Sequence, residues 1–247
     1  MAILSVNILY HKKILDTVQV RNTATFGACC CAAIFWVFRE CGSLAGHMAY
    51  EITGEETRQL LALAVAQQFF GCFVNAAHWL DTWLMRSLAS FITGLFIERY
   101  FGTSEYLFRI RKVLNSVCDY ESRWGQVVLR PLKSDCKVKQ ELHFDARNSF
   151  TCSPLYAEIL FKKGHFVVRM LAKRLGKEPF FQVVQKILSV SMQFSQQQKE
   201  PINWQHMTVS TESFFRTVSN VTGQELPTFL EQWIYGGGHA NFQVSFK

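Results

Sequence analysis

Residues Thr57 to Gly71 read TRQLLALAVAQQFFG, and this stretch decides the fold. Side chains that recur near helical spacing along it are Leu60, Leu61, Leu63, Ala64, Gln67 and Phe70. The spacing predicts an amphipathic helix with Gln67 inside its apolar stripe. Glu55 and Glu56 lie just before the stretch, where acidic side chains favour a helix start, and Gly71 is a typical end. Taken alone, the pattern is equally typical of an ordinary core helix of about four turns.

The end of this stretch resembles a zinc-binding motif. Residues 66–71, AQQFFG, match the close of HELAHQWFG, the motif of aminopeptidase-N-like zinc metallopeptidases. In that motif two histidines one helical turn apart bind the metal, and the glutamate between them activates the metal-bound water. Counted back from Gly71, the three roles fall on Leu63, Gln67 and Ala64. The resemblance implies that ligands and general base are replaced, since leucine and alanine carry no donor atom and a neutral amide binds zinc poorly.

Two further segments resemble the same family, in the same order along the chain. The peptidases carry their third zinc ligand as the glutamate of WLNEGFA, and residues 81–89 here read DTWLMRSLA, with Arg86 at that position. They also carry an oxyanion-stabilising tyrosine in YSKGASVLRML, and residues 161–171 here read FKKGHFVVRML, with Phe161 at that position. Each segment keeps its apolar residues and lacks its chemical group. The resemblance implies a degenerate metallopeptidase that binds no metal and no cofactor.

The replaced positions lead to a structural expectation. We expect Leu63, Gln67 and Arg86 to cluster around the former metal position, with Phe161 nearby. If Arg86 points into that space, it can pair with an acidic neighbour, and its charge would repel a zinc ion.

Within this fold the chain most resembles the TFIID scaffold subunits of the TBP-associated factor 2 type, which lack the zinc site. The residues that carry this resemblance are LALAVAQQFFG at 61–71, VSTESFFRTVSNVTG at 209–223 and FLEQWIYGGG at 229–238. It covers residues 44–247 and implies a non-catalytic role in preinitiation complex assembly and promoter recognition for RNA polymerase II. It also implies a nuclear location and other TFIID subunits as partners, with promoter DNA as a further candidate. No membrane and no small-molecule substrate are implied.

The resemblance also predicts the fold class and the domains. We expect a mainly α-helical, partial thermolysin-like (aminopeptidase-N-type) catalytic domain over residues 44–238, without a zinc site. Residues 239–247 would begin a truncated β-domain, as the first strand of a following β-sandwich. Residues 1–43 have no assigned role, and the alternation over 1–16 suggests a strand or a poorly ordered leader. Because the family is much longer, we expect a fragment. After the first helix, the predicted helices are 82–100, 104–124 with Ser104 as N-cap, 154–175, 178–198, 211–221 capped by Ser210 or Thr211, and 227–235.

Composition restricts the function only loosely. A net charge of +7 and a pI of about 9.0 suit contact with nucleic acid or with an acidic protein. The basic residues form local clusters, Arg109, Arg111 and Lys112, then Lys133, Lys137 and Lys139, then Arg169, Lys173, Arg174 and Lys177. Solvated helix faces explain these clusters better than DNA binding does. The eight cysteines form no CxxC pair, which favours reduced thiols. Residues 22–38 form an uncharged run that favours a buried core helix over a membrane span.

Two other functions fit the same residues. A divergent aminopeptidase could use a relocated metal site that includes His78 and His47. Alternatively, a pseudopeptidase could bind a peptide in the former cleft, lined by Phe70, Trp83 and Phe161, although a core role is the simpler expectation for these three side chains.

Overall fold

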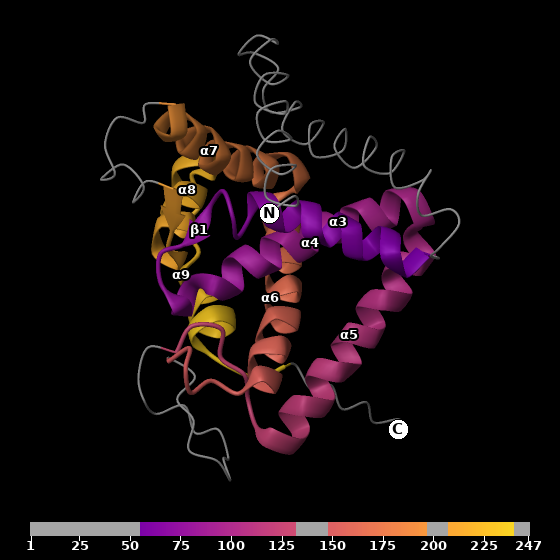
Figure 1. Cartoon of the computed structure of the whole chain (residues 1–247). Helices are drawn as coiled ribbons and strands as arrows, with labels where there is room; N and C mark the ends of the chain where they lie inside the picture. Colours follow the sequence, from indigo (N-terminus) through magenta and orange to yellow (C-terminus); the bar gives the residue numbers. More distant parts are fainter. Residues whose placement is uncertain (1–54, 132–147, 197–206, 240–247) are drawn as a thin grey trace, which may run out of the picture.

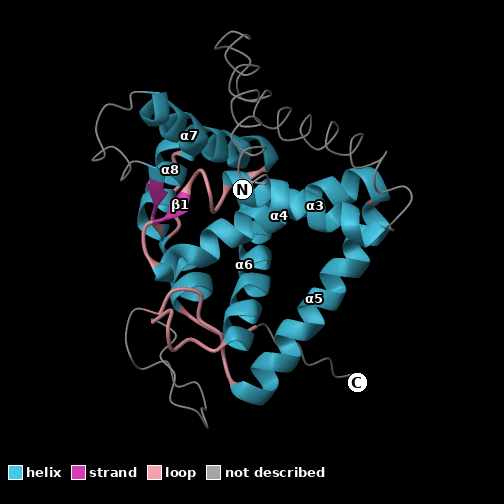
Figure 2. Cartoon of the chain, viewed as in Figure 1, coloured by secondary structure: helices cyan, strands magenta, loops and turns pink. Residues whose placement is uncertain are grey.

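The computed structural model describes residues 55–131, 148–196 and 207–239, and most of this part of the chain is helical (Figure 2). In chain order the elements are α3 (Glu55–Phe69), β1 (Asn75–Ala76), the short 3-10 helix η2 (Trp79–Asp81), α4 (Thr82–Phe101), α5 (Thr103–Trp124), α6 (Pro154–Leu175), α7 (Lys177–Gln196), β2 (Thr208–Val209), α8 (Thr211–Thr222), α9 (Pro227–Phe229) and the π-helical segment η4 (Leu230–Tyr235). The mainly α fold class that the sequence predicts is therefore confirmed.

Helix α4 is the central helix of the fold (Figure 1). Its sequence, TWLMRSLASFITGLFIERYF, is apolar on most sides, which is typical of a helix that is covered all round. Helices α3, α5 and α6 all pack against it. Because α3, α4 and α6 carry the three segments of the family resemblance, the fold places those segments on adjoining helices.

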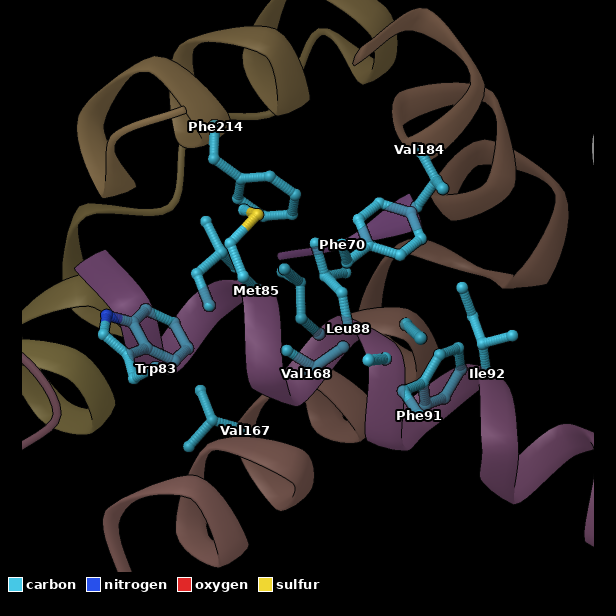
Figure 3. Close-up of a cluster of buried hydrophobic side chains, with 14 of the residues drawn as sticks. Phe70, Trp83, Met85, Leu88, Phe91, Ile92, Val167, Val168, Val184 and Phe214 are labelled. Carbon is cyan, nitrogen blue, oxygen red and sulfur yellow. The ribbon is translucent and has the colours of Figure 1, made fainter. Parts of the chain in front are cut away.

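The core extends from α4 to the far pair of helices, α7 and α8 (Figure 3). Phe70, which follows α3, is completely buried and lies between Leu88 of α4 and Val184 of α7. The side chain of Met85 on α4 faces the ring of Phe214 on α8. Complete burial of a side chain of this size contributes about 1.5–3 kcal/mol to the free energy of folding. Phe70, the second phenylalanine of the AQQFFG segment, thus holds α7 against α3 and α4.

A glycine sets the close packing of α6 on α4. A Cβ atom on Gly164 would overlap the hydroxyl of Ser87 and lie 3.2 Å from Cε3 of Trp83. Only a residue without a side chain fits there, so the sequence element KKGH fixes how near the two helices approach.

The predicted helices agree with the structure, apart from details at their ends. Ser210 caps α8 through a reciprocal capping box with Ser213, and Gly223 ends α8 in the left-handed conformation, as expected. The prediction that Ser104 caps α5 is wrong, because the helix begins one residue earlier, at Thr103, after Gly102. The last predicted helix exists as α9 followed by the π-helical η4.

Other predictions fall on residues that the structure does not describe. These are the strand considered for residues 1–16, the apolar run 22–38, the last two residues of the predicted helix 178–198 and all but the first residue of the β-domain expected over 239–247. Within the described residues, no helix is long and apolar enough to cross a membrane.

The sequence did not predict the small parallel sheet. Strands β1 and β2 pair in parallel, with Asn75 opposite Thr208 and Ala76 opposite Val209. The backbone N–H of Ala77 also donates to the carbonyl of Val209, at 3.0 Å. This pairing ties the chain after α3 to the start of α8.

Candidate functional site

The five residues of the resemblance lie on three helices. Leu63, Ala64 and Gln67 are on α3, Arg86 is on α4 and Phe161 is on α6. Helices α3 and α6 both pack on α4, so the three helices that carry these residues adjoin one another.

The structure places two of these side chains in direct contact. The guanidinium carbon of Arg86 lies 5.5 Å from the centre of the Phe161 ring, a cation–π geometry. Arg86 is exposed, and among the described residues it has no ion-pair partner. The acidic neighbour that we considered for Arg86 is therefore not found in this part of the chain, and an aromatic face takes its place.

The residues on α3 have mixed environments. Leu63 is half-buried and packs against the hydrophobic core, Gln67 is half-buried and Ala64 is exposed. Their clustering with Arg86 remains a prediction. Of the aromatic residues considered for a peptide groove, Phe70 and Trp83 are buried core residues and cannot line one, whereas Phe161 is half-buried.

The donor set does not fit a zinc ion. Leucine, alanine and phenylalanine have no suitable donor atom, the amide of Gln67 is neutral and Arg86 is a cation. In the described ranges, no group of three or more His, Cys, Asp and Glu residues could hold a metal. His78, one of the two histidines considered for a relocated site, is exposed. The described residues thus build no relocated site; His47 lies outside them.

A buried charge network centres on Lys163 of α6, and sequence reasoning missed it. Nζ of Lys163 on α6 is 2.5 Å from Oε1 of Glu121 on α5, and it also donates to the carbonyls of Val127 at 2.7 Å and Gly238 at 3.0 Å. Nδ1 of His239 lies 2.7 Å from the other oxygen of Glu121, Oε2. The network joins α5, the loop after it, α6 and the segment after η4.

Burial and pairing act in opposite directions in this network. Burial alone would raise the pKa of Glu121, but hydrogen bonds from Lys163, His239 and the backbone of Val127 hold it below its usual value. Burial lowers the pKa of Lys163, and Glu121 opposes that change. A sequence signal did exist, because Lys163 follows Ile159 and precedes Val167 by one helical turn each, on the buried stripe of α6.

A second network surrounds Asp81, whose side chain is fully buried at the end of η2. Its Oδ1 accepts from Nε of Arg130 at 2.9 Å, from the backbone N–H of Thr211 at 2.9 Å and from the Thr211 hydroxyl at 2.7 Å. Nη1 of Arg130 also pairs with exposed Glu212 at 2.9 Å. A carboxylate at the start of α8 suits the helix dipole. We interpret both networks as holding the fold together, because their contacts join separate elements and engage the charged groups of Lys163 and Arg130.

His165, one helical turn after Phe161, carries no charge at neutral pH. Burial, with a smaller contribution from the nearby positive charge of Arg169, lowers its pKa to about 4. The residue as a whole is half-buried, and its Nε2 is buried and has no hydrogen-bond partner among the described residues. A neutral imidazole can bind metal, yet in this part of the chain His165 belongs to no group of three or more His, Cys, Asp and Glu residues that could hold one.

A pocket of about 310 Å³ lies away from these residues, between α7, β2 and α8. Its lining combines aliphatic and hydroxyl side chains with one lysine, at positions Lys186, Ile187, Val190, Ser191, Thr208, Val209, Ser213, Thr217, Asn220 and Val221. None of Leu63, Ala64, Gln67, Arg86 and Phe161 contributes to it.

Comparison with known proteins gives the family. The Peptidase family M1 domain matches residues 6–233, which begins earlier than the resemblance we identified from residue 44. Transcription initiation factor TFIID subunit 2 of Caenorhabditis elegans is 39% identical over 96% of this chain and 18% of its own length. The protein of the same name in Drosophila melanogaster is 34% identical over 76% of this chain and 17% of its length. Tricorn protease-interacting factor F2 of Thermoplasma acidophilum is 22% identical over 82% of this chain and 23% of its length.

The match is therefore to one part of much longer relatives. The chain spans only about a sixth of the length of the TFIID subunits that it matches. The family model covers residues 6–233, so the chain belongs to the peptidase family M1, and it is a relative of transcription initiation factor TFIID subunit 2.

Proposed function

We propose that this chain is part of a non-catalytic scaffold subunit of TFIID, which acts in the nucleus. It would support preinitiation complex assembly and promoter recognition for RNA polymerase II by binding other TFIID subunits. The similarity to proteins named TFIID subunit 2 in several animals supports this role. Promoter DNA is a further candidate partner, for which the basic composition is the supporting observation.

The contact between Arg86 and Phe161 is the observation that carries the proposal. The resemblance puts Arg86 in the place of the third zinc ligand and Phe161 in the place of the oxyanion-stabilising tyrosine, and the two lie 5.5 Å apart. A guanidinium held at this position would repel a divalent cation. Zinc lowers the pKa of its bound water from about 15.7 to about 7, so its loss removes about 12 kcal/mol of activation. Loss of an oxyanion donor typically lowers the catalytic rate by a further factor of about 10² to 10³.

Several assignments belong to the same proposal. Leu63, Ala64 and Gln67 would mark the former zinc ligands and general base. Residues 44–238 would form the aminopeptidase-like domain and residues 239–247 the start of a β-domain.

The first experiment measures metal content and activity together. After dialysis against zinc, we expect less than about 0.1 zinc per chain and no aminopeptidase turnover. One tightly bound zinc per chain would instead support the divergent aminopeptidase. A parallel pull-down from nuclear extract, probed for known TFIID subunits, tests the scaffold role directly; recovery of none of them would contradict it.

A second experiment tests the assigned positions. The combined variant Leu63→His, Ala64→Glu, Gln67→His and Arg86→Glu should acquire about one zinc per chain, because it restores two histidines one turn apart and a carboxylate on α4. The matched control keeps Arg86 and changes only the three positions on α3. It should bind zinc far more weakly. Equal binding by both variants, or no binding by the fourfold variant when folded, would show that Arg86 is misassigned.

Peptide binding in the former cleft is a second candidate function. The observation in its favour is that Arg86 is exposed and has no ion pair in the described part of the chain, so its charge is available to a carboxylate. A peptide array that shows no binding weakened by Arg86→Ala would exclude this function.

A further inference from the structure

Helix α5 exposes large apolar side chains on the middle of its outer surface. Leu107, Phe108 and Leu114 are 47%, 64% and 42% exposed. Leu107 and Leu114 are seven residues apart and therefore lie on one side of the helix, with Phe108 at the edge of that surface. Three such side chains within little more than two turns form a patch, whereas single exposed apolar residues are ordinary on any protein.

Two positive charges lie between these apolar side chains. Arg111 and Lys112 are both exposed, and neither has an ion-pair partner among the residues that the structure describes. Arg109, by contrast, already pairs with Glu105 on the same helix, at 2.5 Å. The outer surface of α5 therefore combines apolar side chains with two uncompensated cations.

Leu107 to Leu114 lie between two points at which α5 is anchored to the rest of the fold. Near its start, Tyr106 is buried against Gly94 of α4. Near its end, Glu121 is held by Lys163 of α6. Between these anchors α5 diverges from α6, as Figure 1 shows, and Leu107 to Leu114 lie on the diverging part.

We propose that Leu107, Phe108, Arg111, Lys112 and Leu114 form a docking surface, the α5 surface, for an acidic amphipathic helix of a partner protein. The apolar side chains repeat over about 10 Å of helix, which matches the i, i+3, i+4 and i+7 anchors of a helix bound by its apolar side. Arg111 and Lys112 complement acidic residues that flank such a stripe. The inference goes beyond the scaffold role and does not depend on the former zinc site.

Two other classes of partner fit less well. A nucleic acid would place phosphates against the cations and leave exposed Leu107 and Leu114 in contact with a highly charged backbone. An anionic membrane surface attracts clusters of about four to eight basic residues, and the α5 surface has two. Both alternatives are outcomes of the test below.

The test uses the whole chain and a designed probe. The probe is a fluorescein-labelled synthetic helix with leucine at i, i+3, i+4 and i+7 and glutamate on both flanks. Binding is followed by fluorescence anisotropy, and we expect saturable binding that weakens as salt is added. The double variant Arg111→Glu and Lys112→Glu should weaken binding at least about tenfold, as should Phe108→Ser.

The controls separate docking from nonspecific attraction. Arg174→Glu changes an exposed cation at the end of α6 and should leave probe affinity unchanged. A probe with lysine in place of each glutamate should not bind. Circular dichroism shows that each variant is folded, which matters because these side chains are exposed and their replacement should not affect folding.

Three results would overturn the proposal. These are absence of probe binding up to about 1 mM, the weak limit of specific association, equal affinity of wild type and the α5 variants, or equal affinity for the lysine probe. Tighter binding to phosphatidylserine vesicles or to a DNA duplex, lost in the same variants, would replace the helix by those partners. None of these results bears on zinc content or on recovery of TFIID subunits, so the two proposals fail separately.

Discussion

Lys163 and Glu121 form an ion pair, with Nζ 2.5 Å from Oε1, although their side chains are only 6% and 2% exposed. Two charges leave water here at considerable cost, and the pairing together with hydrogen bonds to Val127, Gly238 and His239 compensates for it. The intact pair therefore adds little to the net free energy of unfolding, whereas removal of one member leaves the other charge buried and unpaired and lowers that free energy strongly.

The first prediction concerns that removal. Lys163→Met leaves the carboxylate of Glu121 buried with only His239 and one backbone N–H, and it should lower the free energy of unfolding by about 3–5 kcal/mol. The neighbouring Lys162→Met is the matched control. Lys162 is 31% exposed and pairs with Glu158, so its replacement should cost less than about 1 kcal/mol. Urea denaturation at pH 7 measures both; equal effects would mean that the buried pair has no special role.

The second prediction concerns pH. His165 has a folded pKa of about 4, below the usual 6.5, so the unfolded chain takes up a proton first as the pH falls. Its contribution to stability is complete above pH 6.5 and is lost between about 6.5 and 4, by about 3 kcal/mol in total.

Denaturation curves at pH 7 and pH 5 measure this loss. The variant His165→Phe should remove most of the difference between the two pH values, whereas His78→Gln, at an exposed histidine, should retain it. A variant at His165 with the wild-type pH profile would contradict the prediction.

The third prediction concerns acid below this range. Because the folded pKa of Glu121 is held below its usual value of 4.5, its stabilising effect is present above that pH and is lost as the pH falls through the lower, folded value. Acid unfolding of Glu121→Gln should therefore depend less on pH below 4.5 than that of the wild type. Parallel curves for the two proteins would show that another carboxylate dominates.

The fourth prediction tests the close approach of α4 and α6. Gly164→Ala should destabilise the chain by about 1–3 kcal/mol, since the new methyl group overlaps the Ser87 hydroxyl. Adding Ser87→Ala removes that hydroxyl and should recover part of the loss, although the Ser87 Cβ would remain 3.3 Å from the new atom. A double variant less stable than the sum of the single changes would rule out this explanation.

The fifth prediction concerns Asp81. Asp81→Ala removes the acceptor for Arg130 and for both groups of Thr211, and should cost about 3–5 kcal/mol. Glu212→Gln is the control at the exposed end of the same network, where the carboxylate is 63% exposed, and should cost less than about 1 kcal/mol. Thermal unfolding compares the two variants directly.

Helical periodicity and end signals were enough to predict the helices. The 20-residue α4 and the cap of α8, expected at Ser210 or Thr211 and found at Ser210, follow from residues close in sequence. The parallel pairing of β1 with β2 was missed because it joins two residues to two others far along the chain, with no local pattern. Ser104 was misassigned because Gly102, which is also an accepted N-cap residue, precedes the helix, so that Ser104 is already its second residue.

For the candidate site, the sequence predicted which residues would matter but not what they touch. The positions of Arg86 and Phe161 come from the family resemblance, and their contact emerges only when α4 and α6 pack together. The buried partners of Lys163 were out of reach for the same reason, since a lysine on an apolar stripe can have its charge either buried or extended to water.

The two buried networks also bear on how the chain folds during synthesis. Asp81 meets Thr211 across 130 positions of sequence, and Glu121 meets His239 across 118. At a synthesis rate of about 5–20 residues per second, Asp81 would wait roughly 6 to 26 seconds for Thr211. During that interval helices α3 to α5 carry charged groups whose partners do not yet exist. We therefore expect the backbone amides of these helices to become protected from hydrogen exchange only after α8 and the segment that follows it have left the ribosome.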